Sequence, residues 1–164
     1  LAVLYHLVFT SAATRVLGID ELLIMLEKSR ADNKEHNVTG VLLYLSGVFL
    51  QVLEGPKDEI LFLYDLIQKD DRNKDIEPVN VGPIDEREFN GWSMGFAVPS
   101  LERLKDVKDY FVVQSSDDFD QVGAQDGGVP IMGPTVNLFK RFYDRSLAQS
   151  GEGSKEDMCL FFNH

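Results

Sequence analysis

The chain has 164 residues, of which 44% are hydrophobic, and its 16 Lys and Arg against 27 Asp and Glu give a formal net charge of −11. That length and apolar content suffice for one domain with a hydrophobic core plus an extension. The excess of acidic residues excludes nucleic acid and anionic membrane surfaces as partners, since binding to either requires a positively charged protein surface.

Cysteine use and hydropathy indicate the cellular setting. Cys159 is the single cysteine, so no disulfide can form within the chain, which is typical of a reducing compartment. No apolar run is long enough to span a bilayer and no signal peptide is recognisable. We therefore expect a cytoplasmic protein.

The first predicted elements are a strand over residues 3–10, a small-residue loop over 11–18 and a helix from Asp20, as N-cap, to about Asn33. Met25 and Leu26 lie on one side of that helix at helical spacing, and Asn33 falls on the same line. A helix-ending Asn in the left-handed conformation is one interpretation of Asn33, and a buried polar contact is the other.

Residues 37–55 form the stretch around which the chain is organised. Residues 41–45 and 48–53 are β-branched, aromatic and leucine-rich, and Ser46-Gly47 between them predicts a tight hairpin turn. Both faces of this hairpin are apolar except at Gln51. A buried amide without partners costs about 1–3 kcal/mol, so Gln51 must meet a backbone group, a water or a polar ligand.

Gly55-Pro56 opens a second predicted helix, whose apolar stripe contains Ile60, Leu63, Tyr64 and Ile67. Asp70 and Arg72 follow at its end, where two solvated charges are the simplest interpretation. Strands over residues 76–81 and 92–98 come next, separated by a polar connection, and Trp92, Met94 and Phe96 share one face of the last strand.

The order β-α-β-β-α-β with an added strand predicts an α+β, ferredoxin-like fold, a five-stranded mixed sheet with two helices on one face. Because the hairpin is apolar on both faces, we expect C-terminal helices, a second copy of the chain, or both on the other face. Beyond residue 98 the sequence predicts a short helix within 101–114, a Gly- and Pro-rich loop over 115–134 and a helix over 135–149. The expected division is a domain of residues 1–98 and an extension of residues 99–164.

Several motifs in order resemble the BLUF family of blue-light sensors that use a flavin. They are LVFTSAA, the helix ending in SRADN, the TGVLLY…GVFLQVLEG hairpin, the KDDRN turn and EREFNGWSMGF. The eleven-residue step from Gly40 to Gln51 matches the family's spacing between its TG pair and its switching glutamine. Each motif alone is weak, but the ordered set over residues 7–97 is specific.

The resemblance implies a bound flavin (FMN, FAD or riboflavin) between the two helices. Gln51 would then be the switching amide, Asn33 would bind the pyrimidine edge of the ring, and Arg72 a ring carbonyl. The remaining implied contacts are Asp70 at the ribityl chain, Ser11 near the same end, Met25 and Ile67 on the ring faces, and Met94 and Trp92 beside Gln51. Asp32 and Asn73 depart from residues common in the family.

Amides suit such a ligand, because the edge of a flavin alternates carbonyl acceptors with an N–H donor and each amide offers both roles. A flat, apolar ring also suits side chains such as Met25 and Ile67. A flavin would therefore give Asn33 and Gln51 a common partner.

Phe9 occupies the position of the family's photoactive tyrosine. Phenylalanine has no phenolic oxygen or exchangeable proton, and Tyr5 lies four residues away, roughly 13 Å along an extended strand. Tyr44 and Tyr64 belong to other elements, and the sequence does not indicate that either contacts the flavin. A deliberate Tyr→Phe change that traps the dark state is the interpretation we favour; a natural lineage with lost or rerouted photochemistry is the alternative. In either case we expect flavin binding without the red-shifted signalling state.

The predicted function is thus a non-enzymatic photoreceptor whose output passes through protein contacts, as a homo-oligomer or with a separate protein partner. Two other classes stay open from the residues alone. One is a small ferredoxin-like enzyme of acylphosphatase type, for which Arg15 and Asn33 are weak candidates. The other is an interaction domain without a cofactor. No metal-ligand spacing is present among His6, His36, His164 and Cys159.

Overall fold

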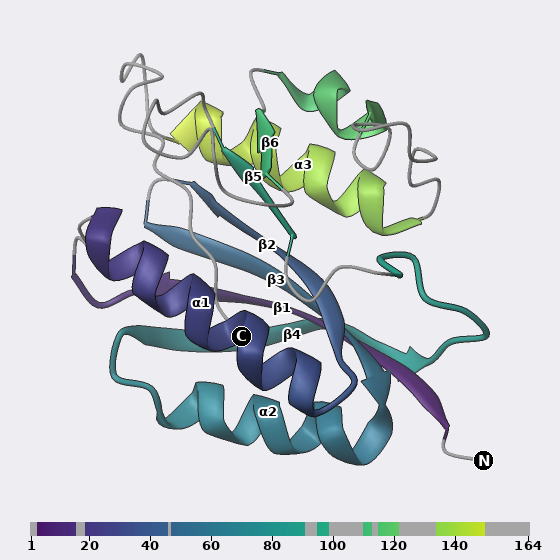
Figure 1. The fold of residues 1–164 in the computed structure, drawn as a ribbon. Coiled ribbons are helices and arrows are strands. Elements are labelled where there is room, and N and C mark those ends of the chain that lie inside the picture. The colour runs from purple at the N-terminus through teal and green to yellow at the C-terminus, as the bar shows by residue number, and fades with distance from the viewer. Residues whose placement is uncertain are drawn as a thin grey trace.

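The computed structural model describes residues 3–15, 19–45, 47–90, 95–98, 110–112, 115–121 and 134–149. Its elements are β1 (Leu4–Ala13), α1 (Ile19–Glu35), β2 (Thr39–Leu45), β3 (Val48–Pro56), α2 (Lys57–Lys69), β4 (Asn73–Pro83), β5 (Gly95–Val98), β6 (Tyr110–Val112), the short 3₁₀ helix η2 (Ser116–Gln121) and α3 (Pro134–Gln149). Figure 1 shows the sheet lying between α1 and α2 on one side and α3 on the other.

The sheet has the order β4-β1-β3-β2-β5-β6. β1 pairs antiparallel with β3 and β4, and β2 pairs antiparallel with β3. The pairs β2–β5 and β5–β6 are parallel. The predicted ferredoxin-like α+β class with a mixed sheet is confirmed, because the order β-α-β-β-α-β places two helices over one face.

The expected count of five strands was wrong, because β6 adds a sixth at the edge of the sheet. Tyr110, Phe111 and Val112 favour strands, and they pair with Phe96, Ala97 and Val98 of β5. No strand was expected within residues 101–114, and the short helix expected there falls on residues 101–109, which lie outside the described part of the chain.

The β2–β3 hairpin is present where the sequence predicts it, and both strands extend beyond the predicted limits. Gly47 turns the chain with a φ of 82°, which a glycine adopts without steric cost. Gly40 allows β2 to approach β3 closely, since a Cβ at this position would lie 2.0 Å from the carbonyl oxygen of Val52. A side chain at residue 40 would therefore displace the strand that carries Gln51.

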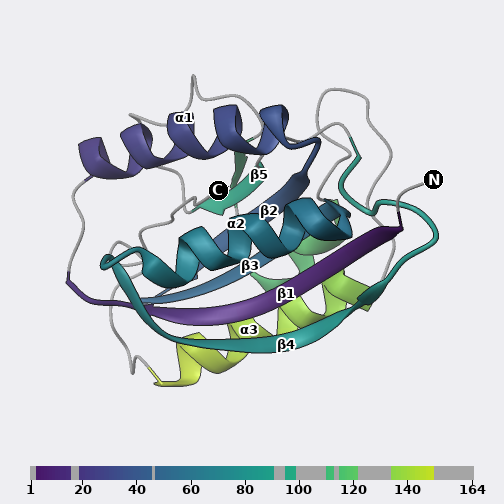
Figure 2. The same cartoon turned by 90° about the horizontal axis from the view of Figure 1, so that it is seen from below.

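The two faces of the sheet bury different residues. On the α1–α2 face, Leu7, Phe9 and Gln51 point toward the helices, and Met25, Leu63 and Ile67 meet them from above. On the opposite face, α3 covers the sheet, as Figure 2 shows from a second direction. The buried α3 residues are Val136, Phe139 and Tyr143, and Phe142 is half-buried beside them. Among the described residues, no helix has the length and apolar content to cross a membrane.

Candidate flavin-binding site

Two buried carboxamides come from different elements on the α1–α2 side of the sheet. Asn33 lies in the last turn of α1 and is 0% exposed, and Gln51 lies in the middle of β3 and is 1% exposed. The left-handed residue after α1 is Asn37, with a φ of 56°, so the interpretation of Asn33 as a left-handed cap was wrong. Gln51 sits in the centre of the sheet, opposite Phe9 on β1 and Leu42 on β2.

Phe9 is paired directly with Gln51 across β1 and β3, so the two side chains emerge on the same face of the sheet. Phe9 is 1% exposed, and its ring meets that of Tyr64 edge-on, with centroids 5.4 Å apart and planes at 60°. Burial raises the pKa of the Tyr64 phenol. The sequence placed Tyr64 on the buried stripe of α2 but gave no sign that it contacts Phe9.

Tyr5 does not occupy this position. It lies opposite Gly55 at the other end of β1, and the ammonium of Lys57 sits 5.4 Å from the centre of its ring. The described part of the chain therefore places Phe9, not Tyr5, beside Gln51.

Met25 and Ile67 are buried residues on the two helices of this face. Both are buried, Met25 on α1 and Ile67 on α2, as the sequence predicted. The Ser29 hydroxyl donates a hydrogen bond of 2.7 Å to the Met25 carbonyl, which satisfies a polar group inside the helix. Ser11 is also buried, two residues after Phe9 on the same face of β1. The predicted loop at Ser11 is thus the last part of a strand.

Asp70 and Arg72 form an ion pair at the end of α2. The Arg72 Nε donates to both Asp70 carboxylate oxygens, at 2.9 and 3.1 Å, and Nη2 donates to Oδ2. The side chains are 13% exposed for Asp70 and 29% for Arg72, so two independent solvated charges were the wrong interpretation. The hydrogen bond to Asp70 raises the pKa of Arg72.

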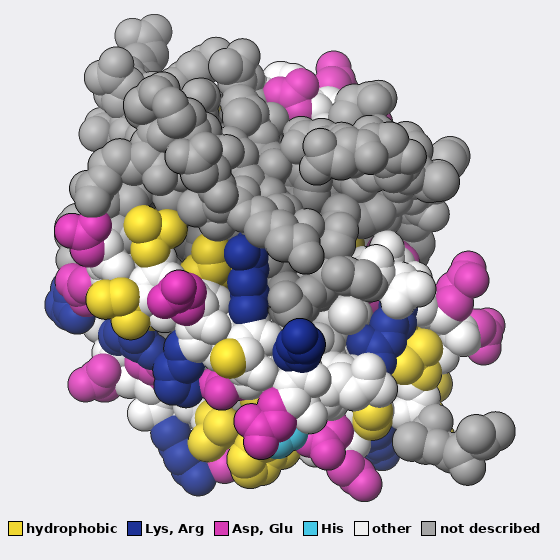
Figure 3. All heavy atoms as spheres, in the orientation of Figure 1, with side chains coloured by type: hydrophobic (Ala, Val, Ile, Leu, Met, Phe, Trp, Pro, Cys, Tyr) yellow, Lys and Arg dark blue, Asp and Glu magenta, His cyan; other side chains and the backbone are white. Residues whose placement is uncertain are grey.

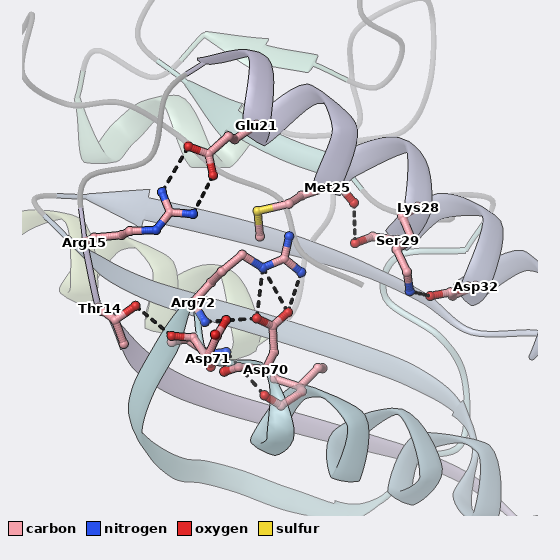
Figure 4. A network of polar contacts seen from close by, with 12 residues as sticks. Thr14, Arg15, Glu21, Met25, Lys28, Ser29, Asp32, Asp70, Asp71 and Arg72 are labelled. Carbon is pink, nitrogen blue, oxygen red and sulfur yellow. Dashed lines mark hydrogen bonds and ion pairs between the residues drawn. The ribbon is translucent and has the colours of Figure 1, made fainter.

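A hollow of about 480 Å³ opens beside this pair. Its lining residues are Lys28, Leu66, Lys69, Asp70, Asp71 and Arg72. Figure 4 shows Met25 pointing from α1 toward Arg72, which reaches up from the turn after α2. Basic, acidic and apolar side chains are interspersed over α1 and α2 on the outer surface (Figure 3). Lys28, Lys69 and Asp71 were not singled out from the sequence, because nothing in their spacing distinguishes them from solvated helix residues.

Asn73 closes the end of α2. Its Nδ2 donates to the carbonyls of Ile67 and Asp70, at 3.2 and 3.1 Å, which are among the carbonyls that a helix end leaves open. Its Oδ1 is buried and accepts no hydrogen bond from the described residues. Asn73 thus fixes the turn that carries Asp70 and Arg72.

The donor set fits a flat heterocycle with a polar edge. Two buried amides supply paired donors and acceptors, and apolar side chains from both helices lie on the same side of the sheet. The predicted residues Trp92 and Met94 lie outside the described residues. Arg15, the weak candidate for a phosphate site, is exposed and paired at 2.7 Å with Glu21.

The structure thus combines a ferredoxin-like sheet with two buried amides on the side that two helices cover. The sequence matches the family described as BLUF, sensors of blue light using FAD, over residues 4–95. The chain belongs to the BLUF family, whose members bind a flavin and sense blue light.

Relatives of known function and solved structures agree with this assignment. The chain is 35% identical to the photoactivated adenylate cyclase subunit beta of Euglena longa over 96 residues, which are 58% of this chain and 11% of that protein. A bacterial light-regulated adenylyl cyclase shares 35% identity with a TM-score of 0.55, over 57% of this chain and 27% of the other. BlrB, a BLUF protein in its dark state, shares 24% identity with a TM-score of 0.59, over 92% of this chain and 98% of BlrB. This likeness concerns the fold alone.

Proposed function

We propose that this chain is a light-sensing module in which Asn33 and Gln51 hold the pyrimidine edge of a bound flavin. The observation that carries the proposal is the burial of two carboxamides, one from α1 and one from β3, on the same side of the sheet. Each carboxamide carries both a donor and an acceptor, and a flavin edge presents the complementary acceptors and donors. The family assignment supports the same ligand.

The other site residues receive roles from their positions. Met25 and Ile67 would pack on the two faces of the ring, and Ser11 would lie near its far end. The Asp70–Arg72 pair lines the hollow at the end of α2, and there Arg72 would donate to a ring carbonyl and Asp70 would meet the ribityl chain. Trp92 and Met94, beside Gln51 in the family, would complete the site.

Reconstitution tests the proposal. Purified chain is mixed with FAD, FMN or riboflavin, separated from free flavin by gel filtration and examined by absorption. We expect a yellow protein with a structured flavin band for at least one of the three. A colourless chain that takes up none of them would overturn the proposal and favour a cofactor-free interaction domain or a small enzyme.

Phe9 determines what the loaded chain can do in light. A bound flavin would supply the absorption of blue light and an acceptor for one electron. At the position opposite Gln51, a tyrosine can give up an electron and a phenolic proton, whereas Phe9 has no hydroxyl and holds no hydrogen bond to the Gln51 amide. We therefore expect the Gln51 rearrangement not to occur in this chain, whether Phe9 is natural or introduced.

The output of a light-competent form would pass through contacts rather than through catalysis by this chain. Residues 1–98 form the sensor in this proposal, and residues 99–164 form an extension that covers the sheet or joins subunits. The chain spans 11% of the Euglena longa relative, so the cyclase activity named there is not carried over to it. Light scattering on the loaded chain tests the expected homo-oligomer, and a monomer at all concentrations would favour a separate protein partner in the cytoplasm.

A further inference from the structure

Glu54 is a buried carboxylate on the face of the sheet opposite the flavin cleft. It lies three residues after Gln51 on β3 and is 1% exposed. Its two oxygens accept hydrogen bonds from the backbone N–H groups of Glu88 and Phe89, at 2.7 and 2.8 Å. Two backbone N–H donors that bind the two oxygens of one carboxyl group fix that group relative to the segment that carries them. β3 is thereby fastened to a segment 34 and 35 residues further along the chain.

Arg87 strengthens the same junction from the other side. Its guanidinium donates to the Glu54 carbonyl at 3.0 Å, to the Thr39 hydroxyl at 2.9 Å and to the Asn37 carbonyl at 2.7 Å. We call Glu54, Arg87, Glu88 and Phe89 with these bonds the clasp. The clasp holds residues 87–89 against the end of β3 and the beginning of β2.

The clasp also reaches α3. Phe89 is buried, and its ring lies 5.9 Å from that of Phe139, centroid to centroid. A continuous set of contacts therefore runs from β3 through the Glu54 carboxylate and the Phe89 backbone to the Phe89 ring and α3. Coupling between two parts of a fold travels through contiguous bonds and packed side chains of this kind.

The geometry points to Glu54 as a positioning residue that couples the Gln51 strand to α3 through Phe89. This inference rests on the proposed function, because it assigns the route by which a change at Gln51 reaches the second face. No contact between Glu54 and the flavin is needed. The carboxylate acts by fixing the Phe89 backbone, and it transmits a displacement of β3.

The charges around Glu54 make the clasp sensitive to pH. The pKa of Glu54 is raised to about 7, because burial and, less strongly, the nearby Glu88 carboxylate raise it by more than the two backbone donors and Arg87 lower it. His6 lies opposite Glu54 on β1 and pairs with Asn80. An opened clasp would return Glu54 to water and to an ordinary pKa near 4.5. As pH rises from about 4.5 to 7, the equilibrium between the closed and the opened clasp therefore shifts toward the opened form, and above pH 7 it no longer changes.

Amide hydrogen exchange of the full chain tests the clasp without light. Glu54→Ala leaves two buried N–H groups without an acceptor, so exchange in a peptide covering residues 84–90 should accelerate about tenfold or more. Glu86→Ala removes an exposed carboxylate from the same connection and should change nothing. In the unaltered chain, protection of residues 88 and 89, corrected for intrinsic exchange, should fall between pH 5 and 7. Glu54→Gln should abolish that dependence.

The outcomes separate this inference from the proposed function. Unchanged exchange in Glu54→Ala, or a pH profile identical in Glu54→Gln and the unaltered chain, would overturn it; the second comparison holds even if Glu54→Ala fails to fold. In flavin-loaded chain carrying Phe9→Tyr, light should alter exchange in residues 84–90 and in α3. Adding Glu54→Gln should reduce the α3 response while the absorption shift persists. An undiminished α3 response would contradict the coupling, whereas a missing absorption shift would count against the proposed function.

Discussion

The two faces of the sheet bury polar groups in different ways. On the α1–α2 face, Ser11, Asn33 and Gln51 are buried polar residues, and a hollow lined by residues of α1, α2 and the turn after α2 opens on the same side of the sheet. On the α3 face, aromatic rings close the core, and the buried Glu54 receives its hydrogen bonds from the chain itself. We propose that the sheet uses one face for a ligand and the other for internal stability, and each prediction below tests that division.

Truncation of an aromatic ring on the α3 face should have the largest effect. Phe139→Ala removes a fully buried ring, which should lower the free energy of unfolding by about 3–5 kcal/mol, with or without flavin. Urea denaturation followed by circular dichroism measures the change. The matched control is Leu61→Ala, at an exposed position of α2, which should stay within about 0.5 kcal/mol. Equal losses in the two variants would show that α3 does not form part of the core.

The pH dependence of stability should reflect Glu54. Because its pKa is about 7 in the folded chain and 4.5 in the unfolded one, the folded state binds more protons between these values. The free energy of unfolding should therefore fall by about 2–4 kcal/mol as pH rises from 4.5 to 7, and this contribution should stay constant above 7. Comparison of the unaltered chain with Glu54→Gln across this range isolates the contribution. Parallel curves for the two proteins would contradict the assignment.

Loss of an amide in the cleft should weaken flavin binding more than it weakens the fold. Asn33→Leu leaves part of the polar edge of the flavin without a partner, so affinity should fall by about 1–3 kcal/mol, or about 5- to 150-fold. Quenching of flavin fluorescence during titration measures the affinity. Asn80→Ala, at an exposed position of β4, serves as the control and should bind as the unaltered chain does. Equal affinity for all three chains would remove Asn33 from the site.

Much of the fold could be predicted from residue patterns. The alternation and β-branched composition of residues 41–53 predicted the hairpin, and the helical spacing of Met25 and Ile67 predicted which sides of α1 and α2 are buried. Asn33 and Gln51 stood out because each is polar on an apolar line. In these cases local sequence determines which face a residue occupies, and burial follows from the face.

Contacts between distant elements could not be predicted in this way. The edge contact of Tyr64 with Phe9 depends on how α2 lies across β1, and the bonds of Glu54 depend on the path of the connection after β4. β6 was missed because three residues carry too little periodicity, and its pairing depends on the neighbouring strand. The spacing of residues along the chain does not indicate how these distant elements pack against one another.

An absorption spectrum in darkness and after blue light, recorded on the flavin-loaded chain and on its Phe9→Tyr variant, tests the central claim most directly. We predict a flavin band that light leaves in place in the unaltered chain, and a stable, thermally reversible red shift in Phe9→Tyr. A reversible red shift in the unaltered chain, or a Phe9→Tyr variant that binds flavin and stays silent, would contradict the place given to Phe9 opposite Gln51.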